Sequence, residues 1–470
     1  MNRPSPAATS LSELSPSARR RSVTAVIAGT AVEYFDWIAY ASFAVYFAPQ
    51  IFPADTQTAS LLQSAAIFAV GFFFRPLGSI FFGKLADRRG RRDALVLSIT
   101  LMTVGTLLIA VTPTYAQAGA LAPALLLVAR VLQGLALGGE YGPLAASLRE
   151  IAPANRRTLY SSAYMSANVI GQVFGFLLLL LLNAVLSKEQ MAAFGWRVPF
   201  VLAALGAVAV GVLRRKMSEG PEFTATVTAA STGPRGSLRE LFTTNRTGTL
   251  LAMTIIGMGT VSFYTYAVYM QKLAVNSFGA KIPEASTIAT VSLLVMGIAQ
   301  PLLGMLGDRV GATTVSAIGF AGCVVVAVPG YLLMSTSPSF SVLLLTACVL
   351  VIFPAMGIAT SQVIVTGLFP ARLRALGAGF ASAATIAVFG GTLEYVALSF
   401  KQADLEILHF VYLTVTSAIG LLAVLAVRKR NWPSGTRLGS TETSQKEKTA
   451  EGGSDRAPTP TAGPAITERG

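Results

Sequence analysis

The sequence predicts an all-α membrane protein in which twelve transmembrane helices form two pseudo-symmetric bundles of six. Of the 470 residues, 53% are hydrophobic and only 12% are charged, and the mean hydropathy is +0.62. Soluble domains keep about a quarter of their residues charged, so this chain has too few charges to cover a water-facing surface. Apolar segments of roughly twenty residues, the length that crosses a bilayer, recur along the chain. A polar stretch over residues 217–245 divides them six and six.

Each expected span is an apolar run that ends at polar residues, glycine or proline. The expected limits are 23–48, 58–82, 94–112, 121–147, 160–186, 197–214, 248–275, 285–306, 313–334, 339–367, 373–400 and 404–427. They group into a cytoplasmic N-terminal segment 1–22, a first bundle 23–214, a cytoplasmic linker 215–247, a second bundle 248–428 and a tail 429–470. The tail is polar and rich in Pro, Gly, Ser and Thr, so we expect it to be disordered.

The net charge of +14 is concentrated in loops on one side of the predicted membrane. That side carries the basic clusters at 19–21, 88–92 and 428–430, whereas the other side holds only Lys188, Arg197, Lys272, Lys281 and Lys401. Because cytoplasmic loops carry an excess of Lys and Arg, both termini are expected in the cytoplasm, at an inner membrane of bacterial type. The lipid bilayer accounts for this charge, so nucleic acid is not expected as a partner.

The sequence carries no pattern typical of catalysis. It has no nucleophile–base arrangement, metal-ligand cluster or phosphate-binding loop, so we expect neither an enzyme nor a metal or cofactor. Cys323 and Cys348 lie in apolar runs and are interpreted as packing residues. His409, the only histidine, lies near the start of the last span and is interpreted as a residue of the membrane interface. Without an ATP-binding motif, any uphill work has to draw on an ion gradient.

Six Asp, Glu and Arg residues lie more than five residues from either end of an expected span, where each costs several kcal/mol and usually faces a pathway or a partner. They are Glu33, Asp36, Arg75, Arg130, Glu140 and Glu394. Glu33 and Asp36 are three residues apart and share one helix face. At a rise of ~1.5 Å per residue, Asp36 and Arg130 fall in the middle third of the membrane. Arg75 and Glu140 fall together in the cytoplasmic third.

These depths predict two acid–base pairs, Asp36 with Arg130 and Arg75 with Glu140. An opposite charge nearby favours the ionised form of a carboxylate. A carboxylate that is paired in one conformation and released in another therefore picks up and drops a proton. This makes Asp36, Glu33 and Glu140 the candidates for proton coupling. The alternative is that the pairs are static bridges that hold the helices together.

Residue spacing in two neighbouring spans predicts close helix contacts. Gly134, Gly138 and Gly142 are four apart and share one face, which lets a neighbouring helix approach. Asn168 and Gln172 are also four apart on one face. Such amides either join helices by hydrogen bonds or contact a ligand.

Tyrosines in the segment 263–272 are candidates to line a polar cavity. Tyr264, Tyr266 and Tyr269 follow one another closely, and Lys272 lies near the outer mouth, where its charge would attract an anion. The alternative for these tyrosines is an aromatic belt at the membrane interface.

A loop signature occurs at the matching place in both halves. Residues 83–92 (GKLADRRGRR) follow the second span, and residues 304–311 (GMLGDRVG) follow the eighth. Paired halves of this kind are typical of secondary transporters. The two stretches resemble the loop signature of the major facilitator superfamily.

Further stretches resemble one family of that superfamily, the metabolite:proton symporters. They are Glu33–Trp37, Arg75–Gly78, Gly138–Gly142 and Trp196–Phe200. The family includes permeases for α-ketoglutarate, citrate, shikimate and proline/betaine. Residues 264–276, 369–377 and 390–398 are most similar to its α-ketoglutarate-transporting members, and the resemblance as a whole covers residues 20–430.

The resemblance implies alternating access, in which the two bundles rock about a central site. By analogy with sugar porters, it implies Asp36 as the proton-coupling acid and Arg130 as its arginine partner. The cytoplasmic gate implied by the loop signatures consists of Gly83, Asp87, Gly90, Arg91, Asp308 and Arg309. Ala312 and Thr313 follow Gly311 where basic residues are typical, so we expect the second-half latch to be weaker.

Residues and resemblance together predict a monomeric, proton-coupled symporter that imports a small carboxylate, most simply a dicarboxylate such as α-ketoglutarate. A guanidinium binds a carboxylate bidentately, which makes the cations candidates for the substrate site. The full candidate set is Arg75, Arg130, Lys272, Tyr264, Tyr269, Asn168 and Gln172. One alternative is the same mechanism with shikimate, citrate or proline/betaine as cargo. The other is a non-transporting membrane sensor with the tail as its output.

Overall fold

The computed structural model describes residues 16–55, 57–89, 91–215, 237–370 and 373–430, which are almost entirely helical. The long helices of the first half are α1 (Pro16–Ile51), α2 (Gln57–Arg89), α3 (Arg91–Val111), α5 (Leu121–Ile151), α6 (Arg157–Val185) and α8 (Val198–Arg215). Those of the second half are α11 (Arg246–Tyr264), α12 (Met270–Phe278), α13 (Ile282–Val310), α14 (Ala312–Thr336), α15 (Phe340–Leu350), α16 (Ile352–Gly367), α17 (Arg374–Thr385), α18 (Gly391–Gln402) and α19 (Ile407–Lys429). Short helices α4 (Tyr115–Ala118), α7 (Lys188–Ala193) and α10 (Leu238–Thr243) lie in the connections.

Eleven helical segments of the described residues are long and apolar enough to cross a membrane. Helix α1 is not among them, although its 36 residues are more than long enough. Two acids, Glu33 and Asp36, and several tyrosines make it less apolar than the others. With α1 included, the structure has the twelve spans that the sequence predicts.

The two largest extensions beyond the expected spans lie at the same end of the molecule. Helix α1 begins at Pro16 instead of residue 23, and α2 ends at Arg89 instead of residue 82. Hydropathy marks the part of a helix that lies in lipid, whereas Arg and Lys are good helix formers and continue the helix into water. The expected tail from residue 431 onward and most of the expected linker, residues 216–236, lie outside the described residues.

Three expected spans are interrupted in the structure. The segments η4 (Thr265–Tyr269) and η6 (Ile386–Gly390) are π-helical, and Val351 separates α15 from α16. Pro354 lies in the first turn of α16 and has no N–H to continue the hydrogen-bond pattern of α15, which explains the break. Single π turns inside α-helices are frequent at functional sites, and they leave the apolar pattern of the sequence unchanged.

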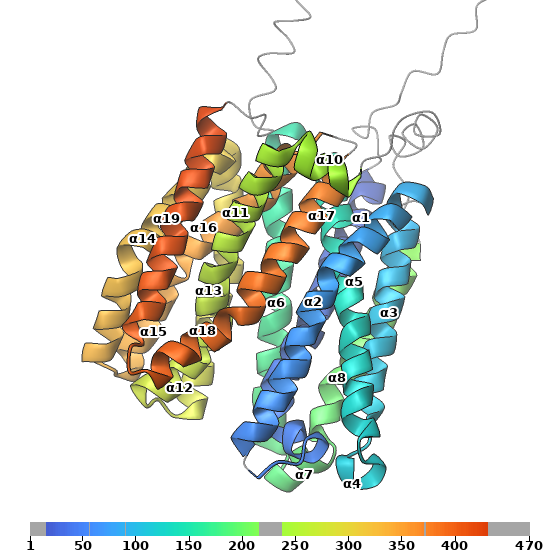
Figure 1. The fold of residues 1–470 in the computed structure, drawn as a ribbon, viewed down its shortest axis with the longest axis vertical. Helices are drawn as coiled ribbons and strands as arrows, with labels where there is room; N and C mark the ends of the chain where they lie inside the picture. The colour runs from blue at the N-terminus through green and yellow to red at the C-terminus, as the bar shows by residue number, and fades with distance from the viewer. Residues whose placement is uncertain (1–15, 56, 90, 216–236, 371–372, 431–470) are drawn as a thin grey trace, which may run out of the picture.

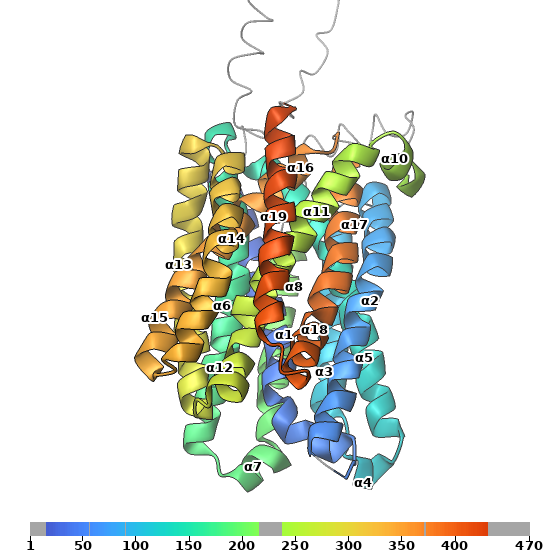
Figure 2. The same cartoon turned by 60° about the vertical axis from the view of Figure 1, so that its left-hand side comes forward.

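The two halves stand side by side, with their helices roughly parallel (Figure 1). Contacts between the halves run along α6 with α13 and along α2 and α5 with α17; Figure 2 shows α17 next to α2. The chain enters α1 and leaves α19 at the same end, the top in Figure 1. We call this end the basic end, because α2 and α8 also finish there, at Arg89 and Arg215. The opposite end is called the distal end.

Helices α2 and α5 pack with their backbones in contact, as the glycine spacing predicts. A Cβ atom at Gly134 would collide with the backbone of Gly71, and one at Gly138 would collide with the backbone of Arg75. The packing around Gly142 lies outside the described part of the structure. The contact matters for the site because it fixes the backbone of Arg75 against α5.

Candidate functional site

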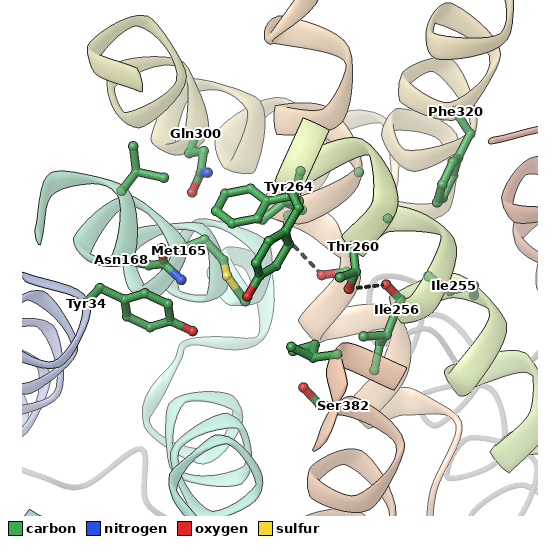
Figure 3. Close-up of a pocket in the computed structure, with 17 residues that line it drawn as sticks. Tyr34, Met165, Asn168, Ile255, Ile256, Thr260, Tyr264, Gln300, Phe320 and Ser382 are labelled. Atoms are coloured by element: carbon green, nitrogen blue, oxygen red, sulfur yellow. Dashed lines mark hydrogen bonds between the residues drawn. The ribbon is translucent and has the colours of Figure 1, made fainter. Parts of the chain in front are cut away.

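A cavity lies between the two halves near the middle of the molecule (Figure 3). Its empty space is about 730 Å³, open solvent at its mouth included. The first half contributes Tyr34 and Asn168, and the second half contributes Tyr264 and Gln300. Further polar lining comes from Thr260, Ser361 and Ser382. Apolar and aromatic side chains form the rest, as is usual for sites that bind small molecules.

The side-chain amides of the cavity differ in whether their polar atoms have hydrogen-bond partners. Asn168 accepts a hydrogen bond from Gln172 Nε2 (2.8 Å), and Gln172 is buried behind it without lining the cavity. Gln300 is fully buried, and neither its Oε1 nor its Nε2 has a hydrogen-bond partner. Leaving a buried polar group unsatisfied costs about 1–3 kcal/mol. Gln300 was not predicted as a site residue from the sequence, because a single amide before Pro301 in an apolar helix gives no distinctive pattern.

A cluster of charged residues adjoins the cavity and shares Tyr34 and Ser382 with it. The cluster surrounds a space of about 390 Å³ and includes Glu33, Arg75 and Glu140. We call it the Arg75 cluster. The expected neighbours Arg75 and Glu140 therefore line one space, and Ser98 Oγ donates to Glu140 Oε1 (2.5 Å).

Arg75 is held between aromatic rings at the boundary of the two halves. Its guanidinium carbon lies 4.4 Å from the ring centroids of both Trp37 and Phe72. It also interacts with the hydroxyl group of Tyr264, from the second half. Its Nε atom is buried and has no hydrogen-bond partner. Such cation–π contacts restrain the guanidinium, and a guanidinium can bind a planar anion such as a carboxylate through two of its N–H groups.

A second charged cluster is formed by Asp36, Gln133 and Arg130. Arg130 donates from one terminal nitrogen to Gln133 Oε1 (2.8 Å), and Gln133 Nε2 donates to Asp36 Oδ2 (2.6 Å) and to Thr106 Oγ1 (2.9 Å). A guanidinium has no acceptor, so the amide oxygen of Gln133 must face Arg130 and its nitrogen must face Asp36. The expected pair of Asp36 and Arg130 is therefore joined through an amide rather than directly. We call this group the Asp36 cluster.

The Asp36 cluster is sealed from the cavity. Arg130 is 1% exposed, and its guanidinium carbon lies 3.6 Å from the ring centroid of Tyr40. Phe68 covers it from another side, at 5.3 Å. Neither Arg130 nor Asp36 lines the cavity or the space beside Arg75. Gln133 was missed from the sequence, although its position three residues after Arg130 places both on one helix face.

Two of the three tyrosines in the segment 263–272 are buried inside the protein. Tyr266 and Tyr269 are each 2% exposed, so the alternative of an aromatic belt is wrong for both. Tyr269 lines a second space on the distal side of Tyr264, together with Trp37 and Phe72. Lys272 is exposed on α12 and lines neither this space nor the cavity.

His409 is also buried, and its interpretation as an interface residue is wrong. The ring has no exposed surface, and its Nε2 lies 3.2 Å from Thr265 Oγ1 in the π-helical segment η4. Tyr269 packs against the same ring, with centroids 5.6 Å apart. The interface was predicted from the position of His409 near the start of a span. Hydropathy does not show that residues of η4 cover the ring.

The two halves are joined at the basic end by Asp308, in the second loop signature. Its two carboxylate oxygens accept the backbone N–H groups of Thr158 (2.8 Å) and Leu159 (3.0 Å), in the first turn of α6. A carboxylate at a helix N-terminus satisfies N–H groups that lack helical partners and also favours the helix dipole. We call this contact the Asp308 latch. Ser161 Oγ, one turn along α6, also donates to Gln362 Oε1 across the halves (3.0 Å).

The other expected gate residues are only partly described. Gly83 lies at the same end, and a Cβ atom there would be 3.6 Å from the side chain of Leu376 in the second half. Arg309 is exposed. The side chains of Asp87 and Arg91, and the whole of Gly90, lie outside the described residues.

Comparison with known proteins identifies the class to which this fold and cavity belong. Residues 22–241 match the family model "Sugar (and other) transporter", and residues 262–450 match "Major Facilitator Superfamily". Among solved structures, that of a proton:xylose symporter, XylE, with a bound bromodeoxyglucose superimposes with a TM-score of 0.74 at 18% identity, covering 91% of this chain and 99% of the other. A partially occluded, inward-open structure of XylE from E. coli superimposes with a TM-score of 0.65 at 16% identity, covering 88% of this chain and 98% of the other.

Curated relatives define the family more narrowly. The chain is 36% identical to the alpha-ketoglutarate permease of Escherichia coli over 427 residues, which is 90% of this chain and 97% of that protein. It is 32% identical to a citrate-proton symporter of Klebsiella pneumoniae, over 80% of this chain and 84% of that one. A proline/betaine transporter of Salmonella typhimurium is 28% identical, over 87% of this chain and 83% of that one. The chain belongs to the metabolite:proton symporters of the major facilitator superfamily.

Membership of this family settles several expectations. The protein is a multi-pass membrane transporter and not an enzyme. The alternative of a non-transporting sensor is wrong, because the relatives are transporters along nearly their whole length. The relatives carry different cargoes, and the family alone does not choose among them.

Proposed function

We propose that this protein is a proton-coupled symporter that imports a small carboxylate, most simply a dicarboxylate such as α-ketoglutarate. The observation that carries the proposal is Arg75, a buried guanidinium against two aromatic rings, in the space beside a cavity between the two halves. Similarity to the alpha-ketoglutarate permease along 90% of the chain supports this cargo. We place the protein in a bacterial inner membrane, with the basic end and both termini in the cytoplasm, by the positive-inside bias.

In this proposal, Arg75 binds a substrate carboxylate in the middle of the molecule. The guanidinium already contacts Tyr264 of the second half, so an anion at Arg75 lies where the halves meet. Tyr264, Tyr34 and Asn168 line the path along the cavity. Lys272 is exposed at the distal end, so its role is to attract the anion before it enters.

Alternating access follows from the Asp308 latch. In the structure, Asp308 holds the basic end together, and the second space opens beyond Tyr264 towards the distal end. Substrate enters from the distal side in this conformation. Release to the cytoplasm requires the N–H groups of Thr158 and Leu159 to leave the carboxylate of Asp308, so that the basic end opens.

Proton coupling is assigned to the Asp36 cluster. The carboxylate of Asp36 meets the charge of Arg130 only through Gln133, so a small shift of α5 against α1 changes its environment. Asp36 therefore takes up a proton in one conformation and releases it in the other. Because it is sealed from the cavity, the proton and the substrate use different parts of the protein.

A second proton is needed for a doubly charged substrate. One proton entering with a dianion leaves one net negative charge to move against an inside-negative potential, at ~2.3 kcal/mol per 100 mV. Glu33 and Glu140 in the Arg75 cluster are the carboxylates available to carry it. Their position in the space that holds Arg75 lets substrate binding and protonation influence one another.

Uptake into proteoliposomes tests the proposal. Labelled α-ketoglutarate, citrate, shikimate and proline are offered separately, with and without an imposed pH gradient, acid outside. We expect concentrative uptake of α-ketoglutarate that disappears when a protonophore is added. Uptake of proline but of no acid would refute the cargo, and accumulation that survives the protonophore would refute proton coupling.

A further inference from the structure

Gln300 presents an unsatisfied amide to the cavity. It is fully buried, and both its oxygen and its nitrogen lack hydrogen-bond partners in the described structure. Figure 3 shows this amide pointing into the cavity, on the side of Asn168 and Tyr264. A buried amide whose two polar atoms both lack partners is arranged to bind a ligand or ordered water.

Asn168 offers a second amide group from the opposite half. Its oxygen is already engaged by Gln172, so its amide nitrogen remains to donate to a ligand. In Figure 3, this nitrogen is directed towards the cavity. Gln300 comes from α13 and Asn168 from α6, and these two helices pack along the seam between the halves. A ligand bound to both amides therefore joins the two halves.

The described charges around the cavity can neutralise one ionised carboxylate of a substrate. Among the described residues that line the cavity itself, there is no Asp, Glu, Lys or Arg. In the adjoining space, Arg75 is the one cation among the described lining residues, beside Glu33 and Glu140. Arg130 is covered by aromatic rings, and Lys272 is exposed on α12. A second carboxylate would therefore meet amides instead of a cation.

We propose that Gln300 and Asn168 form an amide subsite for the uncharged end of the substrate, opposite the carboxylate held by Arg75. The subsite rests on the proposed function and makes it more specific. Gln300 supplies an acceptor as well as donors, so the group that satisfies it both accepts and donates hydrogen bonds. A protonated carboxyl or a carboxamide does so, whereas a carboxylate or an ester only accepts. A dicarboxylate accordingly binds as its monoanion, and its own carboxyl group then carries the second proton in place of Glu33 or Glu140.

Competition by glutarate and two of its derivatives tests the subsite. Glutarate, its monoamide and its monomethyl ester are each added against labelled α-ketoglutarate in proteoliposomes at pH 7.5. We expect the monoamide to compete about tenfold better than the ester, because only the amide donates to Gln300, and one hydrogen bond contributes roughly that factor. We expect competition by glutarate to strengthen as the external pH is lowered at constant internal pH.

Variants of Gln300 test whether this residue causes the preference for the monoamide over the monomethyl ester. Gln300→Met keeps the length of the side chain without its hydrogen bonds, and we expect it to abolish the difference between amide and ester. Gln300→Glu replaces the donors by acceptors. We expect this variant to weaken competition by glutarate and to keep the preference for the amide over the ester. The matched control is Gln271→Met, since Gln271 donates to Ser286 outside the cavity. This control is expected to preserve the wild-type order.

Two results would overturn the subsite while leaving the proposed function intact. One is equal competition by amide and ester in the wild type. The other is an unchanged preference for the amide in Gln300→Met. Failure of the wild type to take up any labelled carboxylate is a different result, because it removes the proposed function itself.

Discussion

At the scale of single residues, the two charged clusters separate the roles of the two buried arginines. Arg75 lines a space beside the cavity, whereas Arg130 is sealed under Tyr40 and Phe68. From the sequence, both arginines were candidates for substrate binding and for proton coupling. Hydropathy and depth do not show which side of a helix faces a cavity. The structure supports the substrate role for Arg75 and a coupling role for Arg130.

Asp36→Asn tests the assignment of the coupling acid. Asparagine keeps an acceptor for Gln133 and cannot exchange a proton, so we expect the variant to lose more than tenfold of its accumulation driven by a pH gradient. Exchange of internal for external substrate requires no net proton release and should continue. The measurement is uptake and counterflow in the same liposomes. Normal gradient-driven accumulation by this variant would contradict the assignment.

Gln133→Leu tests whether the amide between Asp36 and Arg130 positions them. Leucine has a similar size and cannot bridge, so the two buried charges either meet directly or lose a partner. We expect the pH at which uptake is half-maximal to shift by at least half a unit, with exchange retained. Gln133→Glu still accepts a hydrogen bond from Arg130 but places a second carboxylate next to Asp36. We expect its pH of half-maximal uptake to differ from that of Gln133→Leu. Identical pH profiles in wild type and both variants would show that Gln133 is only a packing residue.

At the scale of helices, the sequence was sufficient for the spans and insufficient for their interruptions. Apolar runs located all twelve spans, because the bilayer imposes their length. The π segments η4 and η6 were not predicted, since they change the hydrogen bonding and leave the apolar pattern intact. Gln300 and Gln133 were missed for a related reason: one polar side chain in a long apolar run gives no periodic signal. Helix ends were missed where basic residues continue a helix into water.

Gly138→Ala tests the close approach of α2 and α5. Its Cβ atom would collide with the backbone of Arg75, which cannot move without shifting the helix. We expect lower thermal stability, by several degrees, and an increased KM for the substrate, because Arg75 is displaced. Gly211→Ala on α8 is the control, since its nearest contact would be an ordinary 3.7 Å to Ile99. Equal behaviour of both variants would contradict the tight contact.

Asp308→Asn tests the latch between α13 and α6. The amide loses the charge and one of the two acceptors, so the first turn of α6 is held less firmly across the halves. We expect faster hydrogen exchange at the amides of Thr158 and Leu159, and a larger fraction of molecules open at the basic end. Asp93→Asn, an exposed acid in the first turn of α3, is the matched control. Unchanged exchange in Asp308→Asn would show that the contact does not hold this end closed.

At the scale of the whole molecule, the cavity depends on both halves and on their relative tilt. Its lining comes from α1 and α6 on one side and from α11, α13, α14, α16, α17 and η6 on the other. The internal repeat of loop signatures predicted two halves, and Asp308 showed how one of them closes the basic end. The relation between the clusters could not be predicted, because it depends on how helices of different halves face one another.

The central claim is that substrate and proton enter together, and one measurement tests it most directly. Proteoliposomes are prepared with equal pH and no potential on either side, in weakly buffered medium, and unlabelled α-ketoglutarate is added outside. We expect the external medium to become more alkaline in wild-type vesicles as protons enter with the substrate, and we expect no such change with Asp36→Asn vesicles. Entry of labelled α-ketoglutarate at the same rate without any change of external pH would contradict it.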